Sequence, residues 1–279
     1  MRWLGRHEFQ VPGHDGVELF GYRLGAGPPL LLSHGFTGSS LDFVDHLVAL
    51  AQSHTVIAWD HRGHGLSGKP RDEHAYSLEK AAADLGTVAD AHGVDRFHLL
   101  GHSMGGMIVA AFLEQHAARV DRLILMDTTP NPADLDWTWF EAGAEHVRRG
   151  GIAAMLAAEQ QARAEGHRAQ TAIERWLWEE RPGFAQRETA RGLAVAPAAF
   201  LAFGRAMASA PDRRAVVAAF PRPLLVMCGE HDVRFHSASR DMVEANGNAC
   251  YIMLRGAAHC PNNDTPEPWR RALLRFLRA

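Results

Sequence analysis

The stretch Gly101-His102-Ser103-Met104-Gly105-Gly106 decides how the rest of the chain is interpreted. Residues 97–100 before it are apolar enough for a buried strand, and residues 107–113 after it suit a helix with a wide apolar face. A serine between a strand and a helix, with glycine two residues away on each side, matches the G-x-S-x-G pattern. Side chains at the glycine positions would clash with the neighbouring elements. We therefore predict a strained turn that holds up the Ser103 hydroxyl; an ordinary glycine-rich turn is the alternative.

Short apolar segments alternate with helical patterns along most of the chain. Residues 7–11 and 17–24 alternate apolar and polar side chains around residues 14–16, which predicts an antiparallel hairpin. Further strands are predicted at residues 30–32, 55–59, 97–100, 123–126, 224–228 and 249–254, and further helices at about 41–52, 77–92, 237–244 and 269–277. This alternation predicts an α/β fold with a doubly wound, mostly parallel sheet, and functional loops at the carboxyl ends of its strands.

The alternation stops in the middle of the chain. Residues 130–219 show helical periodicity without a clear strand, and they hold four of the seven tryptophans. We predict that this segment is an all-helical cap inserted into a core made of residues 1–129 and 220–279. The alternative is that these helices extend the core on the flank of the sheet.

Composition narrows the class of protein. The chain has 279 residues, of which 47% are hydrophobic and 22% charged, with a net charge of -3 and no long basic run. These values are typical of a globular protein and predict no nucleic-acid partner. The three cysteines are an odd number, which favours free thiols in a reducing compartment. No stretch approaches the roughly 18 apolar residues of a membrane span, and residues 1–8 lack a signal-peptide core. We expect a cytoplasmic protein with no membrane partner, as a monomer or homodimer.

A serine hydroxyl needs a base to take its proton, and an imidazole base needs an acid to orient it. The chain has 17 histidines, but His259 directly follows the last predicted strand. Asp232 follows the strand 224–228, and Asp127 ends the strand 123–126. Each of these positions lies at the carboxyl edge of the sheet. We predict Ser103 as nucleophile, His259 as base and Asp232 as acid, with Asp127 as the alternative acid.

Acyl transfer also needs donors for the negative oxygen of the tetrahedral intermediate, and loss of one typically costs about 3 kcal/mol. The N–H of Met104 begins the predicted helix after the turn. Gly35 allows the loop after strand 30–32 to approach the site, so the N–H of Phe36 is the second predicted donor. The Phe36 side chain either lines the acyl pocket or only fills the core.

Candidate substrate-binding residues share a place in the active-edge loops or in the cap. They are His34, Phe36, His102, Trp137, Trp139 and Trp176. A structural interpretation competes for each: His34 orders its glycine turn, His102 packs at the strand end, and the tryptophans pack the cap against the core. No metal and no cofactor is expected.

These residues together resemble the α/β-hydrolase family, and within it the serine esterases and lactonases. The matching segments follow the family's order over nearly all of the chain outside the cap: Ser33-His34-Gly35-Phe36, residues 60–67, Gly101-His102-Ser103-Met104-Gly105-Gly106, Gly229-Glu230-His231-Asp232 and Ala258-His259. The resemblance implies the same roles for Ser103, Asp232, His259 and the two amides. Epoxide hydrolases and haloalkane dehalogenases of the family carry aspartate where Ser103 stands.

The expected activity is cofactor-independent cleavage of a small, apolar carboxylic ester or lactone through an acyl-enzyme. A carbon–carbon bond hydrolase, or a lyase similar to that of the menaquinone pathway, is the alternative. Carbon–carbon hydrolases usually carry an asparagine-like residue at the place of His102 and a tryptophan soon after the histidine, where Cys260-Pro261 stands here. A non-catalytic binding protein is a minor alternative, because such proteins usually have an incomplete triad. The cap would select the small-molecule substrate.

Overall fold

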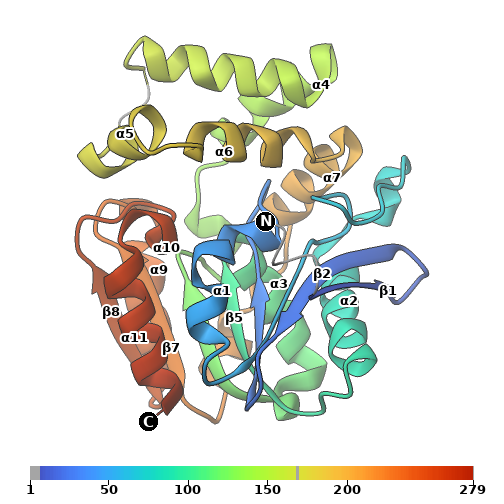
Figure 1. Ribbon diagram of the computed structural model, residues 1–279, viewed down its shortest axis with the longest axis vertical. Coiled ribbons are helices and arrows are strands. Elements are labelled where there is room, and N and C mark those ends of the chain that lie inside the picture. Colours follow the sequence, from blue (N-terminus) through green and yellow to red (C-terminus); the bar gives the residue numbers. More distant parts are fainter. Residues whose placement is uncertain (1–6, 168–169, 279) are drawn as a thin grey trace.

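An eight-stranded sheet forms the centre of the computed structural model, which describes residues 7–167 and 170–278 (Figure 1). The strand order is β1-β2-β4-β3-β5-β6-β7-β8. The pairs β1–β2 and β2–β4 are antiparallel, and every other pair is parallel. The strands are β1 (Glu8–Pro12), β2 (Glu18–Leu24), β3 (Pro29–Ser33), β4 (Thr55–Trp59), β5 (Phe97–His102), β6 (Val120–Met126), β7 (Leu224–Gly229) and β8 (Ala249–Leu254). The predicted doubly wound, mostly parallel sheet is confirmed.

Helices cover both faces of this sheet, which explains why its central strands are apolar on both sides. In β3, Leu31 packs with the helices α2 and α3, whereas Leu30 and Leu32 pack with α1 and α11. All three leucines are fully buried. The core helices are α1 (Val44–Leu50), α2 (Leu78–Ala91), α3 (Met104–His116), α9 (His236–Ala245), α10 (Pro261–Asp264) and α11 (Pro266–Arg278).

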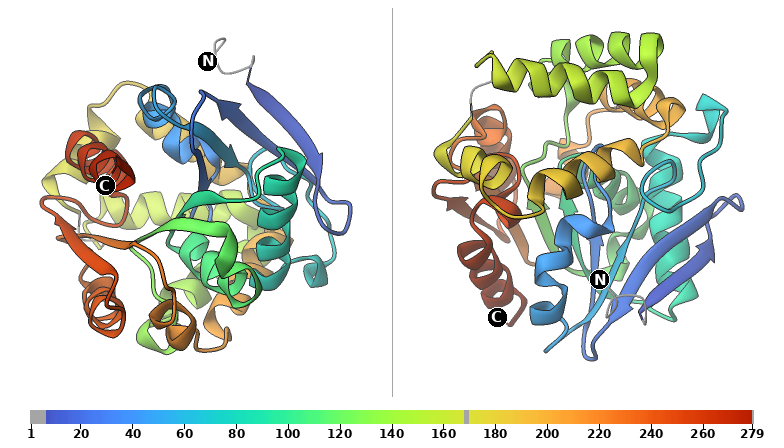
Figure 2. Two further views of the ribbon diagram at one scale, coloured as in Figure 1. Left: turned by 90° about the horizontal axis from the view of Figure 1, so that it is seen from below. Right: turned by 45° about the horizontal axis from the view of Figure 1, so that its top comes forward.

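The described part of the segment between β6 and β7 consists of helices and connecting loops without a strand, and most of it lies over one end of the sheet (Figures 1 and 2). Its helices are α4 (Thr138–Ala164), α5 (Ala172–Glu179), α6 (Phe184–Leu193), α7 (Pro197–Ala208) and α8 (Arg214–Ala218). Helix α4 is broken at Gly150 and Gly151, and it packs on α6 and α7. The predicted cap range also includes α8, but Val217 of α8 is buried in the core beside α3. We therefore use "cap" below for α4 to α7.

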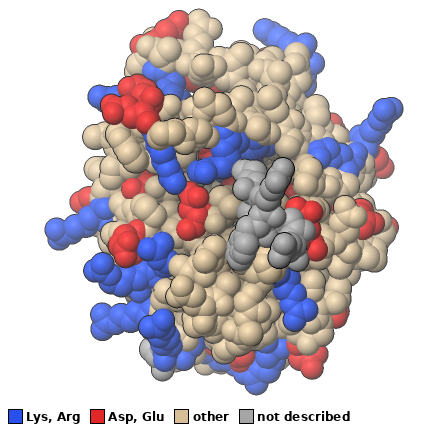
Figure 3. Space-filling view, viewed as in Figure 1, with Lys and Arg blue, Asp and Glu red and all other residues tan. Residues whose placement is uncertain are grey.

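Ion pairs connect this cap to the core. Arg181 of the cap lies 2.7 Å from Asp45, and Arg191 of α6 lies 2.6 Å from Asp42. On the face shown in Figure 3, basic and acidic side chains are interspersed. Exposed ion pairs contribute about 0–1 kcal/mol each, but Arg191 and Asp42 are both shielded from solvent.

Among residues 7–167 and 170–278, no helix is both long and apolar enough to cross a bilayer.

Candidate active site

Ser103 lies at a sharp turn between β5 and α3, and its backbone is strained. Its φ of 53° and ψ of -120° fall in a region that residues other than glycine rarely adopt. A β-carbon on Gly105 would lie 2.3 Å from the carbonyl oxygen of Ser33. A β-carbon on Gly101 would lie 2.7 Å from the carbonyl oxygen of Gly105. The two glycines therefore allow the turn to sit directly against β3 and α3.

Gly105→Ala is expected to lower both stability and activity. The new methyl group would meet the backbone oxygens of Ser33 and His34, which cannot move aside as a flexible side chain can. Overpacking of this kind costs about 1–3 kcal/mol, and a displacement of about 1 Å in an active site can cost about 100-fold in rate. Gly247→Ala is the matched control, because no atom lies within 4 Å of its added carbon. Equal melting temperatures and ester turnover in the two variants would contradict this account.

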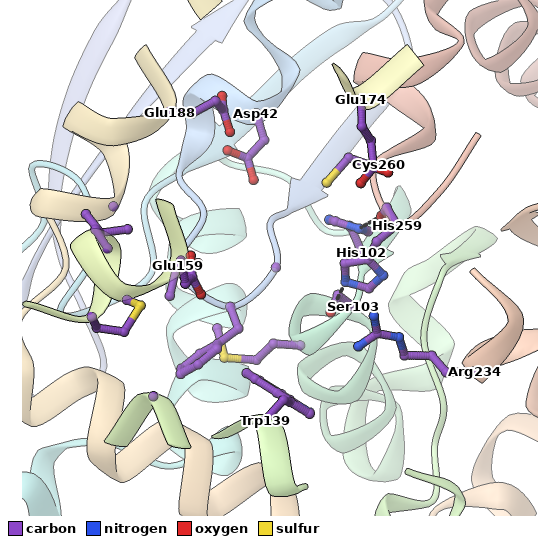
Figure 4. A pocket seen from close by; sticks show the side chains of 18 of the residues that line it. Asp42, His102, Ser103, Trp139, Glu159, Glu174, Glu188, Arg234, His259 and Cys260 are labelled. Atoms are coloured by element: carbon purple, nitrogen blue, oxygen red, sulfur yellow. Dashed lines mark hydrogen bonds between the residues drawn. The ribbon is translucent and has the colours of Figure 1, made fainter. Parts of the chain in front are cut away.

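The structure brings Ser103, His259 and Asp232 together. Figure 4 shows Ser103 beside His259. The Ser103 Oγ lies 3.0 Å from His259 Nε2, and His259 Nδ1 lies 2.5 Å from Asp232 Oδ2. A carboxylate only accepts hydrogen bonds, so Nδ1 carries the proton and Nε2 is free to accept the Ser103 proton. Burial opposes ionisation of Asp232, but the charges of His259 and Arg234 prevail and the pKa of Asp232 is lowered. This arrangement suits removal of the Ser103 proton by a neutral imidazole.

Asp127, the alternative acid, lies behind Asp232 and makes a different contact. Its Oδ1 accepts the N–H of Gly229 at 2.9 Å, and its side chain is buried. A carboxyl oxygen of Asp127, a carboxyl oxygen of Asp232 and a ring nitrogen of His259 all lie within 4.8 Å of one another. Burial and the nearby charge of Asp232 raise the pKa of Asp127 well above its usual range. Asp232 is therefore the carboxyl group in contact with the imidazole, whereas Asp127 contacts the backbone of β7.

Three contacts hold the loop that carries His259. His102 Nε2 donates to the carbonyl oxygen of His259 at 2.7 Å. The Phe235 ring stacks on the His259 ring with centroids 5.3 Å apart. Asp264 Oδ2 accepts the N–H of Ala258 at 2.8 Å. Burial and the charge of His259 lower the pKa of His102 to about 4, so this ring stays neutral. The loop is thus tied to the serine turn, to the Asp232 loop and to α10.

Asp264→Asn is expected to change how stability depends on pH. Burial raises the pKa of Asp264 to about 7 although its carboxylate accepts the N–H of Ala258. The folded protein therefore keeps a proton that the unfolded chain releases near pH 4. Through this group the free energy of unfolding falls as the pH rises from about 4 to about 7. The asparagine variant lacks that component, so urea denaturation should show a smaller loss between about pH 5 and about pH 8 than in the natural chain. An unchanged pH dependence would contradict the assignment.

The two predicted oxyanion donors lie on the backbone segments next to Ser103. Met104 is the first residue of α3, where helix N–H groups have no partner within the helix. The loop that carries Phe36 is equally near, since a β-carbon on Gly35 would lie 3.2 Å from Ser103 Cβ. Within the described part of the chain, the N–H groups of Phe36 and Met104 have no recorded acceptor. The lack of an internal acceptor is what a role as oxyanion donors would require, and that role stays a prediction.

A cavity of about 810 Å³ opens at Ser103 and extends beneath the cap. One part of its wall is apolar, and Phe36 belongs to both the wall and the cap packing, with its ring 4.8 Å from Phe200 and 6.0 Å from Trp139. Another part is charged: it contains Asp42 and Glu188, which Figure 4 shows, and also Arg191. Of the predicted substrate-binding residues, the cavity is lined by Phe36, His102, Trp137 and Trp139.

Two predicted substrate-binding residues are outside this cavity. His34 is fully buried, with Nδ1 bonded to the carbonyl oxygen of Gly35 and Nε2 accepting the N–H of His61. It orders the loop, as the competing interpretation proposed. Trp176 is half exposed, and Trp178 lines the cavity in its place. The two positions are about 200° apart around helix α5, so the two side chains point in nearly opposite directions. Knowing which face of α5 is turned toward the cavity would have been enough to choose Trp178 over Trp176.

The charged wall residues were not predicted. Arg191 follows Arg187 by one helical turn, so both arginines lie on the same face of α6 and pair with Asp42 and Asp45 of the core. This spacing was the one feature of the sequence that could have indicated a basic helix face directed at the core. Arg234 lies two residues after Asp232 and also lines the cavity. Nothing in its sequence context distinguishes it from a surface arginine.

A family model described as the alpha/beta hydrolase fold matches residues 28–265. The chain belongs to the α/β-hydrolase family. It is 30% identical over 257 residues to a Pseudomonas savastanoi protein provisionally named carbamate hydrolase RutD, covering 90% of this chain and 94% of that one. Several relatives and solved neighbours are named as hydrolases or esterases, and this chain is an enzyme of the α/β-hydrolase type.

Solved structures give the same result for the fold. A thermophilic esterase from Thermogutta terrifontis superposes with a TM-score of 0.81 and 25% identity, over 97% of this hydrolase and 98% of that chain. An enol-lactonase from Burkholderia xenovorans superposes with a TM-score of 0.82 at 24% identity, over 97% and 100% of the two chains. The second likeness concerns the fold alone.

Proposed function

We propose that this α/β-hydrolase is a serine hydrolase that cleaves carboxylic esters or lactones through an acyl-enzyme on Ser103. The observation that carries the proposal is the continuous contact from Ser103 Oγ to His259 Nε2 at 3.0 Å and from His259 Nδ1 to Asp232 at 2.5 Å. Both ring nitrogens have the partner that general-base catalysis requires. The strained backbone at Ser103 holds its hydroxyl at the cavity wall.

In the first half of the reaction, His259 Nε2 takes the Ser103 proton as Oγ attacks the substrate carbonyl. The positive charge that develops on the ring is stabilised by Asp232, and the negative oxygen accepts hydrogen bonds from the N–H groups of Phe36 and Met104. His259 then gives its proton to the leaving oxygen. The bond between carbonyl carbon and leaving oxygen breaks, and the acyl group stays on Ser103.

In the second half, water takes the place of the leaving group. His259 removes a proton from this water as it attacks the acyl carbon, and the same two amides bind the new oxyanion. Collapse of the intermediate returns the proton to Ser103 and releases the carboxylic acid. A lactone gives one hydroxy acid, because its leaving group stays attached to the acyl group.

The cavity supports an apolar substrate that is larger than a short alkyl ester. Its volume of about 810 Å³ lies in the upper part of the roughly 300–1,000 Å³ range of ligand sites. Trp137, Trp139 and Trp178 supply aromatic surface that favours an apolar or aromatic acyl or alcohol group. A cavity of this size fits substrates larger than the small ester or lactone expected from the sequence.

A panel of p-nitrophenyl esters and lactones of increasing acyl size tests the proposal. Turnover by the natural chain and its loss in Ser103→Ala are the expected result, with kcat/KM rising as the acyl group grows. Turnover that is equal in both proteins would overturn it. Product analysis distinguishes ester cleavage from cleavage of a carbon–carbon bond.

Carbamate cleavage is a second candidate. The relative provisionally named a carbamate hydrolase aligns with 90% of this chain, and carbamates are attacked by the same machinery at an acyl carbon. Including aryl carbamates in the panel separates the two: a carbamate hydrolase should release the carbamoyl group in many turnovers, whereas an esterase should retain it on Ser103.

A further inference from the structure

Arg234 places a guanidinium group in the active-site cavity that the proposed chemistry does not use. It lies in the short helix η6 (Val233–Phe235), directly after Asp232 in the loop that follows β7. Its Nε lies 3.1 Å from Asp232 Oδ1, and its side chain is 55% exposed. In Figure 4 its terminal nitrogens point into the cavity toward Ser103. The Nε atom is thus paired with the triad, while the rest of the guanidinium faces the cavity.

The hydrogen-bonding capacity of Arg234 is largely unused. A guanidinium has five N–H donors, and within residues 7–167 and 170–278 the recorded carboxylate partner of Arg234 is Asp232, through Nε. Arg191, also in the cavity wall, is by contrast matched by two carboxylates, Asp42 at 2.6 Å and Glu188 at 2.6 Å. The terminal nitrogens of Arg234 are therefore available for a ligand beside Ser103.

The other charges of the cavity define where an anion fits. Figure 4 shows Asp42, Glu188 and Glu174 on the side of Ser103 away from Arg234. Glu159 also lies apart from Arg234 in that view. At the far wall Arg191 is already paired with Asp42 and Glu188, and Glu174 adds a further carboxylate, whereas next to Arg234 an anionic group meets a cation with free N–H donors. The charge distribution thus favours an anion on one side of Ser103.

We propose that Arg234 binds a carboxylate carried by the substrate and selects anionic esters or lactones over neutral ones. This inference rests on the proposed function, because it concerns the substrate of the same site. A guanidinium matches a carboxylate with two parallel N–H···O bonds, which fixes orientation as well as charge. The ion pair between Nε and Asp232 holds the group in place before substrate arrives. Arg234 moves no proton and is a specificity-determining residue.

Two matched pairs of esters test the proposal, one for each half of the substrate. The acyl pair is the p-nitrophenyl ester of adipic acid with its second carboxyl free, and the same ester with that carboxyl methylated. The alcohol pair is 4-(butyryloxy)benzoate and its methyl ester. In each pair the two molecules differ by one charge at the same position, so the ratio of their kcat/KM values measures recognition of the carboxylate.

Arg234→Gln is expected to lower the charged-to-neutral ratio at least tenfold in one pair, mainly through KM. Because Arg234 also touches Asp232, the variant loses some activity on both esters, but this common factor cancels in the ratio. Arg234→Lys should restore part of the ratio, since it keeps the charge without the two parallel bonds. Arg240→Gln removes an exposed positive charge from α9 outside the cavity, and it should leave the ratio unchanged.

A ratio that stays within about twofold in both pairs would overturn the role of Arg234, since the two parallel charge-assisted hydrogen bonds that the proposal requires exceed that effect. Failure of the proposed function has a different signature, namely no Ser103-dependent turnover of any of the four esters. In that event, calorimetric binding of 4-(butyryloxy)benzoate to Ser103→Ala decides the question, because it needs no reaction. Adding Arg234→Gln to Ser103→Ala should then weaken binding at least tenfold, and unchanged affinity would contradict the proposal.

Discussion

Ser103→Ala should lower kcat for ester hydrolysis by about 10⁵-fold or more, with a folded protein and an unaltered cavity. The methyl group has no electron pair to attack the carbonyl, so the acyl-enzyme route is closed. Any remaining turnover would come from bound substrate and the amides of Phe36 and Met104, which still favour attack by water. Steady-state rates on a short p-nitrophenyl ester, together with the melting temperature, measure the two effects separately.

Ser239→Ala is the matched control for this prediction. Ser239 is a buried serine of α9 that does not line the cavity. It should keep ester turnover close to that of the natural chain. Retention of more than about one hundredth of the activity in Ser103→Ala would be incompatible with a serine nucleophile.

The second large effect separates the two aspartates. Asp232→Asn should lower kcat by about 10⁴-fold, because an amide no longer stabilises the imidazolium and can select the wrong ring tautomer. Asp127→Asn should cost less than about tenfold, since the asparagine oxygen still accepts the N–H of Gly229 and it is Asp232 whose carboxylate contacts His259. Both variants replace a buried carboxyl group with an amide, and the two sites are neighbours, so each variant is a control for the other.

Rates for both variants at neutral pH, with circular dichroism to check folding, decide the assignment. A larger loss in Asp127→Asn would reassign the acid to the end of β6. Equal losses in folded proteins would mean that the two carboxyl groups act as one unit, which the separate contacts to His259 and Gly229 argue against.

The sheet and the residues at its edge could be predicted because their signals are local. The glycines at 101 and 105 are needed where the backbone of one element touches another, and the structure shows contacts below 3 Å for a β-carbon at both. Asp232 and His259 each follow an apolar strand, and parallel strands bring their carboxyl ends to one edge. The choice between Asp232 and Asp127 required coordinates, because both positions satisfy that rule.

The cavity wall was harder to predict, because it depends on how the cap helices are turned. Trp176 and Trp178 have the same chemistry and nearly the same position in the sequence, yet opposite surroundings. Arg191 reaches a carboxylate 149 residues away, and Arg234 faces the cavity only because of the path of the Asp232 loop. His34 lies in the expected loop, but its ring nitrogens are used inside the fold.

Trapping of the acyl group tests the central claim most directly. The hydrolase is mixed with p-nitrophenyl dimethylcarbamate, whose carbamoyl group leaves slowly because the nitrogen lone pair weakens the carbonyl as an electrophile. Acid quenching, intact mass spectrometry and peptide mapping then locate the adduct. We predict one dimethylcarbamoyl group per chain on Ser103, and none in Ser103→Ala. An adduct on another residue, or ester hydrolysis that persists in Ser103→Ala, would contradict the account.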